Sequence, residues 1–234
     1  MFRILAAALA ATFCLCANAA DVSGTASATF TNPQPTGGAI ATTGVGTASF
    51  TWGAKFTPVN QMDFAGTAFA SNFESPFKLG TLAYFNGLSA TGTVPNSVDL
   101  AVKLAFVDPL IPDVTSSFTL EPLSTVNNST PDANADFVKF SNVFSDTSFV
   151  IGSTTYRVKI TGFENVVGDG FLVSDATQFH IREGSVASAD LFAVVTSQTP
   201  AVPEPRSYVL MLTGLALVAG TSSRRRNTGA ISVA

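Results

Sequence analysis

Short runs in which apolar and polar residues alternate dominate the central part of this chain. The alternation is clear in Ala26–Thr31, Leu100–Phe106 and Thr155–Ile160. A period of two places every second side chain on one face, which is typical of an antiparallel strand with one buried face. Gly- and Pro-rich turn signals such as Asn86-Gly87 separate the runs. The pattern predicts an all-β fold, an antiparallel β-sandwich with jelly-roll-like topology.

Other segments extend this prediction. Three more alternating runs and one continuous apolar run are predicted as strands: Ala48–Trp52, Phe77–Leu82, Thr177–Arg182 and Asp190–Thr196. The polar segments Asn32–Gly46 and Thr125–Ala135 are predicted as long loops. No window longer than about ten residues has the apolar spacing of an amphipathic helix. We therefore expect one β-sandwich domain over residues 21–200.

The first 20 residues have the form of a secretory signal peptide. Arg3 gives a basic start, Ile4–Ala17 is an apolar run, and small residues precede Ala20. We expect signal peptidase to remove residues 1–20 on export. Both cysteines of the chain lie in this segment, so the exported part is expected to have neither a disulfide nor a thiolate nucleophile.

A short proline-containing motif comes directly after the predicted domain. The motif occupies residues 202–206 and contains Val202, Pro203, Glu204 and Pro205. Two prolines in three positions keep a segment extended, because proline fixes its own backbone angle and restricts the residue before it. The motif is therefore expected to be an extended linker between the domain and the C-terminal apolar segment.

That C-terminal segment ends in positive charge. Residues 207–223 contain no charged side chain, and Arg224, Arg225 and Arg226 come directly after it. As a helix this segment would span roughly 25 Å at about 1.5 Å per residue, slightly less than the hydrocarbon core of a bilayer. Arginine clusters favour the cytoplasmic side, so this transmembrane helix would leave the domain outside.

This order of elements resembles the PEP-CTERM proteins of Gram-negative bacteria. The resemblance covers roughly the 25 residues before Asn227, a PEP-CTERM sorting signal over residues 201–226. It implies that an exosortase processes the chain at the inner membrane. The domain would then reach the cell surface or the extracellular matrix, linked to exopolysaccharide. The chain continues for eight residues beyond the arginines, whereas many members of the family stop sooner.

The domain itself resembles the choice-of-anchor K domain. The similarity lies in Phe50–Gly53, Phe77–Gly87 and later pieces such as Tyr156–Phe163, and it would cover roughly residues 48–196. That family is an extracellular β domain attached to interchangeable surface-sorting tails. The resemblance implies a fold and a location, and it brings no catalytic residue to this chain.

Charge narrows the range of partners. Residues 21–200 contain seven basic and fifteen acidic side chains, which gives a net charge of −8. An acidic domain repels phosphate backbones, so we expect no nucleic-acid partner.

Motifs for catalysis are missing from the sequence, and one motif for metal binding is present in part. The chain has no Gly-x-Ser-x-Gly, His-Glu-x-x-His or phosphate-binding loop, and His180 is its only histidine. Asp132, Asn134 and Asp136 offer oxygen atoms at alternate positions, which suits calcium. Phe137 and Val143 stand where an EF-hand requires glycine and glutamate. We expect no cofactor, with a looser calcium site at these three residues as the alternative to a plain turn.

These observations predict a non-enzymatic role, as a structural or adhesive component or a carbohydrate-binding module of the cell surface. The alternative is a secreted polysaccharide hydrolase, which needs two carboxyl groups at a suitable separation in a cleft. An exposed aromatic platform favours sugar binding, and Trp52 and Tyr84 are the aromatic residues to inspect, although core packing is expected for both.

Overall fold

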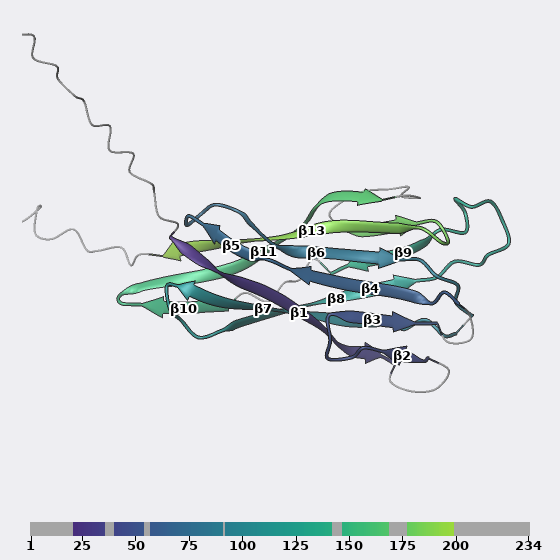
Figure 1. Ribbon diagram of the computed structural model, residues 1–234, viewed down its shortest axis with the longest axis horizontal. Helices are drawn as coiled ribbons and strands as arrows, with labels where there is room; N and C mark the ends of the chain where they lie inside the picture. The colour runs from purple at the N-terminus through teal and green to yellow at the C-terminus, as the bar shows by residue number, and fades with distance from the viewer. Residues whose placement is uncertain are drawn as a thin grey trace, which may run out of the picture.

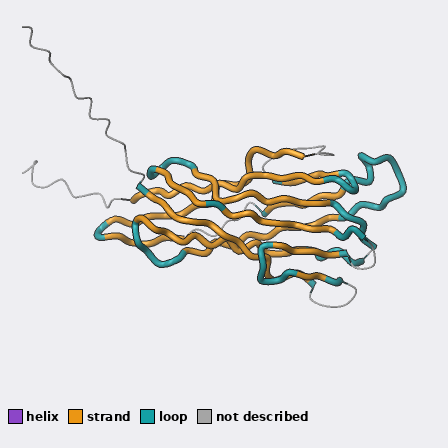
Figure 2. The backbone as a smooth tube through the Cα atoms, viewed as in Figure 1, coloured by secondary structure: helices purple, strands orange, loops and turns teal. Residues whose placement is uncertain are grey.

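Strands form the regular structure of the computed structural model, which describes residues 21–35, 40–53, 57–90, 92–141, 147–168 and 177–198. Within these ranges there is no helix (Figure 2). No helix long and apolar enough to cross a membrane occurs in this described part. The predicted signal peptide (1–20) and the predicted sorting signal (201–226), including its motif, its transmembrane segment and its arginines, lie outside the described residues.

Two antiparallel sheets make up the domain (Figure 1). The six-stranded sheet has the order β12 (Gln178–Ile181), β9 (Asp136–Phe140), β8 (Val114–Leu123), β7 (Ser97–Asp108), β1 (Val22–Gln34), β5 (Ala68–Ser71). The seven-stranded sheet has the order β10 (Thr147–Ile151), β11 (Thr154–Gly168), β13 (Val186–Gln198), β6 (Phe77–Phe85), β4 (Asn60–Gly66), β3 (Ser49–Trp52), β2 (Thr42–Thr43).

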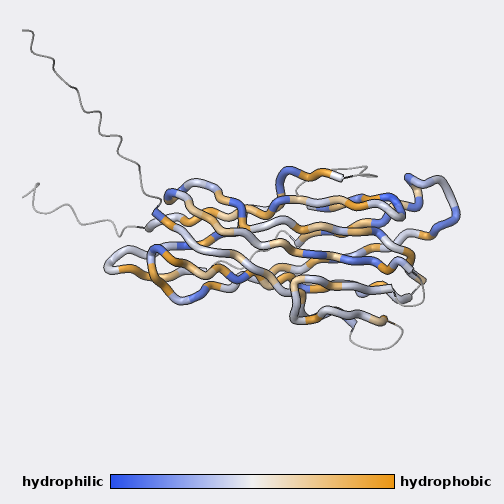
Figure 3. The backbone as a smooth tube through the Cα atoms, viewed as in Figure 1, coloured by the Kyte–Doolittle hydropathy of each residue, from blue (hydrophilic) through white to orange (hydrophobic). Residues whose placement is uncertain are grey.

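The core lies between the sheets, as in a β-sandwich. In β1 the side chains of Ala26, Ala28 and Phe30 are buried, while those of Thr25 and Ser27 are exposed. The same alternation runs through most strands and appears as alternating colour along them in Figure 3. Aromatic rings join the two inner faces in the pairs Phe30–Phe50, Phe69–Phe77, Phe118–Phe163 and Phe140–Phe163, with centroids 4.4–5.7 Å apart.

The chain passes from one sheet to the other between β4 and β5, where a single residue connects them. The N–H of Thr67 donates to Leu79 in the seven-stranded sheet (3.0 Å), and its carbonyl accepts from the N–H of Ala26 in the six-stranded sheet (2.9 Å). A Cβ atom on the preceding Gly66 would collide with the carbonyl oxygen of Ala26. Glycine therefore allows β4 to approach β1 closely enough for the crossing.

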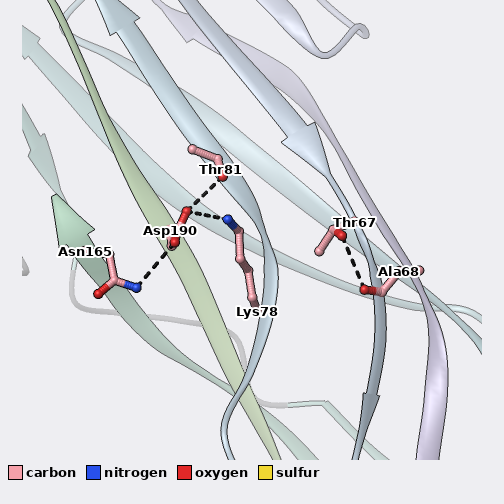
Figure 4. A network of polar contacts seen from close by, with 6 residues as sticks. All are labelled: Thr67, Ala68, Lys78, Thr81, Asn165 and Asp190. Carbon is pink, nitrogen blue, oxygen red and sulfur yellow. Dashed lines mark hydrogen bonds and ion pairs between the residues drawn. The ribbon is translucent and has the colours of Figure 1, made fainter. Parts of the chain in front are cut away.

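A polar network ties three strands together on the outer face of the seven-stranded sheet (Figure 4). The carboxylate of Asp190 in β13 accepts from Lys78 (2.7 Å) and Thr81 (2.8 Å) of β6 and from Asn165 (3.3 Å) of β11. Burial raises the pKa of Asp190, but these donors and the charge of Lys78 outweigh it, so the net shift is downward. The network is a cross-strand contact on a half-exposed surface.

The two ends of the sandwich differ in the segments that they carry. The start of β1 and the end of β13 lie at the same end, on the left of Figure 1. The turn after β5 contacts both, because Asp21 accepts from the N–H of Phe73 (3.0 Å) and Glu74 from that of Ser197 (2.9 Å). The opposite end, here called the loop end, carries the β6–β7 and β8–β9 loops.

All seven predicted runs lie within or overlap strands, so the all-β prediction is confirmed. The loop predicted over Asn32–Gly46 is wrong in part. β1 continues to Gln34, which pairs with Ser97, and Thr42 pairs with Trp52. Hydrogen bonding to neighbouring strands thus overrides a local composition rich in glycine, threonine and proline.

Candidate functional site

A groove with a volume of about 660 Å³ opens between the two loops of the loop end. One wall comes from the β6–β7 loop and the other from the end of β8 and the β8–β9 loop. The residues that line it are Ser89, Ala90, Gly92, Val94, Pro95, Asn96, Pro122, Leu123, Ser124, Thr125, Val126 and Asn127. Its volume is in the range of small-ligand sites.

The lining is uncharged and combines two kinds of surface. Hydroxyl and amide groups come from serine, threonine and asparagine, and apolar surface comes from proline, valine and leucine. Neither an ionisable nor an aromatic side chain is among the lining residues. The hydroxyl groups of Ser89 and Ser124 lie 3.1 Å apart and so join the two walls.

A buried carboxyl group lies directly behind one wall. Asp136, at the start of β9, is 2 % exposed, and its Oδ1 accepts from the backbone N–H (2.6 Å) and the hydroxyl (3.2 Å) of Thr125. Burial raises the pKa of Asp136 to about 6, and the charge of Glu183 adds to the rise, while the bonds from Thr125 oppose it. The carboxyl therefore titrates near neutral pH and fixes the position of a groove residue.

A second buried polar cluster supports the β6–β7 loop. The hydroxyl of Tyr84 donates to Asn60 Oδ1 (2.9 Å), which also accepts from the N–H of Gly87 (3.1 Å). Asn86 Nδ2 donates to the carbonyl of Ile181 in β12 (2.8 Å). Burial, followed by the charges of Asp136 and Glu183, raises the pKa of Tyr84 well above its usual range. These contacts hold the loop against three strands of the core.

The two aromatic residues named as a sugar platform to inspect are both inside the sandwich. Trp52 is 2 % exposed and Tyr84 is 1 % exposed, and their rings stack with centroids 5.6 Å apart. Both are core residues, as expected. Neither ring has an exposed face on which a sugar could stack.

The single histidine, His180 in β12, is half-buried. It alternates with the buried residues Phe179 and Ile181 and so lies on the other face of the sheet, but an aromatic ring covers it there. The ring of His180 stacks on Phe137 of the neighbouring strand at 3.8 Å, and its Nδ1 has no hydrogen-bond partner among the described residues. Burial lowers the pKa of His180. Neutral imidazole on an aromatic ring is a packing arrangement, and no nucleophile lies beside it in the described contacts.

The three candidate calcium ligands have separate partners. Asp132 forms an ion pair with Arg182, Asn134 exchanges hydrogen bonds with the backbone of Ser129 (2.9 and 3.2 Å), and Asp136 is buried against Thr125. Within the described ranges, no group of three or more acidic, histidine or cysteine side chains is placed to hold a metal ion. These oxygen atoms therefore form the ion pair and hydrogen bonds that hold the β8–β9 loop and the start of β9.

We expect calcium removal to leave the stability of the protein unchanged. Chelation with EGTA should not shift the melting temperature, because Asp132 already has a cationic partner and Asp136 is buried. Differential scanning fluorimetry with and without about 1 mM calcium, the upper end of the Kd range of extracellular modules, measures this. A melting temperature that rises with calcium in the wild type but not in Asn134→Ala would instead establish the calcium site.

The groove could not be predicted from the sequence. The polar composition of Thr125–Ala135 predicts a loop, but nothing in the order of residues indicates that residues 89, 90 and 92–96 face it. The turn signal at Asn86-Gly87 is the available hint, since β6 ends at Phe85 and the irregular segment after it leads into the opposite wall. Comparison with known proteins gives no matching family model and no matching curated protein.

Proposed function

We propose that this protein is an exported, non-enzymatic component of the surface of a Gram-negative bacterium. In this proposal a jelly-roll-like sandwich stands between a cleaved signal helix and a C-terminal transmembrane helix. An exosortase processes the tail, and the domain acts as a structural, adhesive or carbohydrate-binding module linked to exopolysaccharide.

The observation that carries the proposal is the position of the groove relative to the end of the last described strand. The last described strand, β13, ends at the opposite end of the sandwich from the groove (Figure 1). In the proposed arrangement the anchoring tail continues from β13, so the anchor begins at the end of the sandwich opposite the groove. That arrangement suits a module that contacts material outside the cell.

A hydrolase finds less support. The raised pKa of Asp136 is a property of general acids in glycosidases. However, the carboxyl is 2 % exposed, and the groove-lining residues include no carboxylate. The usual mechanism needs two carboxyl groups that both reach the scissile bond. The non-enzymatic role is therefore favoured.

Removing residues 202–234 is expected to release the domain into the medium. Without the motif, the apolar segment and the arginines, neither exosortase nor the bilayer can retain it. Immunoblots of cell and medium fractions from a strain with exosortase measure the distribution. A matched variant that lacks only residues 228–234 should behave like the full chain. Retention of the longer deletion on the cell would contradict the sorting role.

A further inference from the structure

We propose that the groove at the loop end binds an uncharged segment of a sugar chain. This inference rests on the proposed function, and it adds a site and a ligand charge to it. The site is the space between the wall to which residues 89, 90 and 92–96 belong and the wall formed by Pro122–Asn127.

The charge of the ligand is inferred from the charges around the groove. No lining residue is ionisable, so a charged ligand would lose its hydration without gaining a partner. The ionisable groups that bond to the wall residues are acidic: Glu183 accepts from Asn127 Nδ2 (2.5 Å), and Asp136 lies behind Thr125. Arg182, the cation close by, is paired with Asp132. A polymer rich in carboxylate or sulfate groups would therefore be repelled.

The mixed lining matches the two surfaces of a sugar ring. Hexoses present C–H faces that can pack on the exposed side chains of Leu123 and Val126, and hydroxyl edges that can bond to Asn96, Ser124 and Asn127. The groove is partly open to solvent, so it can hold a short stretch of a sugar chain. Because no aromatic ring lines it, we expect weak binding at a single site, with a Kd near about 1 mM.

The walls are held in place before any ligand arrives. The hydroxyl of Thr93 donates to the carbonyl of Ala90 (2.7 Å) within one wall, and Asp136 fixes Thr125 in the other. The hydrogen bond between Ser89 and Ser124 joins the two. A preformed site binds with a smaller loss of conformational entropy than a flexible loop.

The test compares three oligosaccharides of equal length that differ in charge: a neutral β-glucan, an oligouronate and a glucosamine oligomer. Each is titrated into the full chain in detergent micelles, and the Kd is measured by NMR chemical-shift perturbation. We expect saturable binding of the neutral oligomer that is insensitive to salt, and at least about tenfold weaker binding of the oligouronate, equal to 1.4 kcal/mol.

Two variants locate the site. Ser89→Leu places a bulky aliphatic side chain in the groove, removes the hydroxyl that bonds to Ser124, and should weaken binding of the neutral oligomer at least about tenfold. Asn96→Ala removes one lining amide and should weaken it about two- to tenfold. Ser153→Leu is the matched control, because Ser153 is exposed in the β10–β11 turn, at the opposite end of the sandwich. It should bind like the wild type. Melting curves verify that each variant is folded.

The other outcomes overturn the inference in distinguishable ways. Neutral binding that survives both groove variants places the sugar site elsewhere and leaves the proposed function standing. Tighter, salt-sensitive binding of the oligouronate or the glucosamine oligomer refutes an uncharged ligand. Absence of binding to all three oligomers refutes the groove as a sugar site, whereas the release assay on the tail deletion decides the proposed function independently.

Discussion

Replacing Asp136 with asparagine is expected to stabilise the protein by about 3 kcal/mol at pH 8 and to have little effect at pH 4. The wild-type carboxyl has its pKa raised from 3.8 to about 6, mainly by burial. That difference corresponds to about 3 kcal/mol between the protonated and ionised forms. Asparagine keeps an oxygen that can accept from the N–H and hydroxyl of Thr125 but cannot ionise.

The sign of the pH dependence is set by proton binding. Between about pH 4 and pH 6 the unfolded carboxyl is ionised while the folded one holds its proton, so the folded state binds more protons. The free energy of unfolding therefore falls as pH rises through this window and is constant, for this group, above it. Urea unfolding of wild type and Asp136→Asn at pH 4, 5, 6, 7 and 8 measures the difference directly.

Asp190 provides a matched control of opposite sign. Its pKa is lowered, because the donors Lys78, Thr81 and Asn165 outweigh the burial that raises it. Asp190→Asn should therefore destabilise the protein at pH 7, and the loss should shrink as pH falls through the lowered pKa of the carboxyl. An Asp136→Asn effect that is the same at pH 4 and pH 8 would contradict a buried, titrating carboxyl at position 136.

The strands could be predicted from the sequence because each has its own period of two. β1, β7 and β11 alternate clearly, and their inner residues form the core in the structure. β2 has two residues and no pattern, and it exists because Thr42 and Thr43 bond to β3. Such a strand depends on a partner outside its own local pattern, so periodicity cannot detect it.

The groove and the role of Asp136 are harder to predict from the sequence, for a related reason. The Asp-x-Asn-x-Asp spacing from Asp132 to Asp136 describes a loop with oxygen atoms, but it does not say which of them faces solvent. In the structure one carboxyl pairs with Arg182, 50 residues away, and the other turns inward at the start of β9. Contacts between loops at the end of a sandwich depend on which strands are neighbours, and short-range spacing does not carry that information.

Phe163→Ala is expected to lower the free energy of unfolding by about 3–5 kcal/mol. Phe163 of β11 is 1 % exposed, and its ring contacts Phe118 (5.7 Å) and Phe140 (4.4 Å) of the opposite sheet. Truncation leaves a cavity between the sheets and removes two aromatic pairs at once. Because domains are stable by only about 5–15 kcal/mol, the variant should lose a large part of its stability.

A substitution in β10, at the edge of the same sheet, is the control for the loss of core packing at Phe163. Val150 is 65 % exposed, so Val150→Ala should change the free energy of unfolding by at most about 0.5 kcal/mol. Urea unfolding followed by intrinsic fluorescence of Trp52, which lies in the same core, reports both variants. Phe163→Leu should lose less than Phe163→Ala, because leucine fills part of the cavity. If Phe163→Ala were as stable as Val150→Ala, the two sheets would not share the core that their inner aromatic rings define.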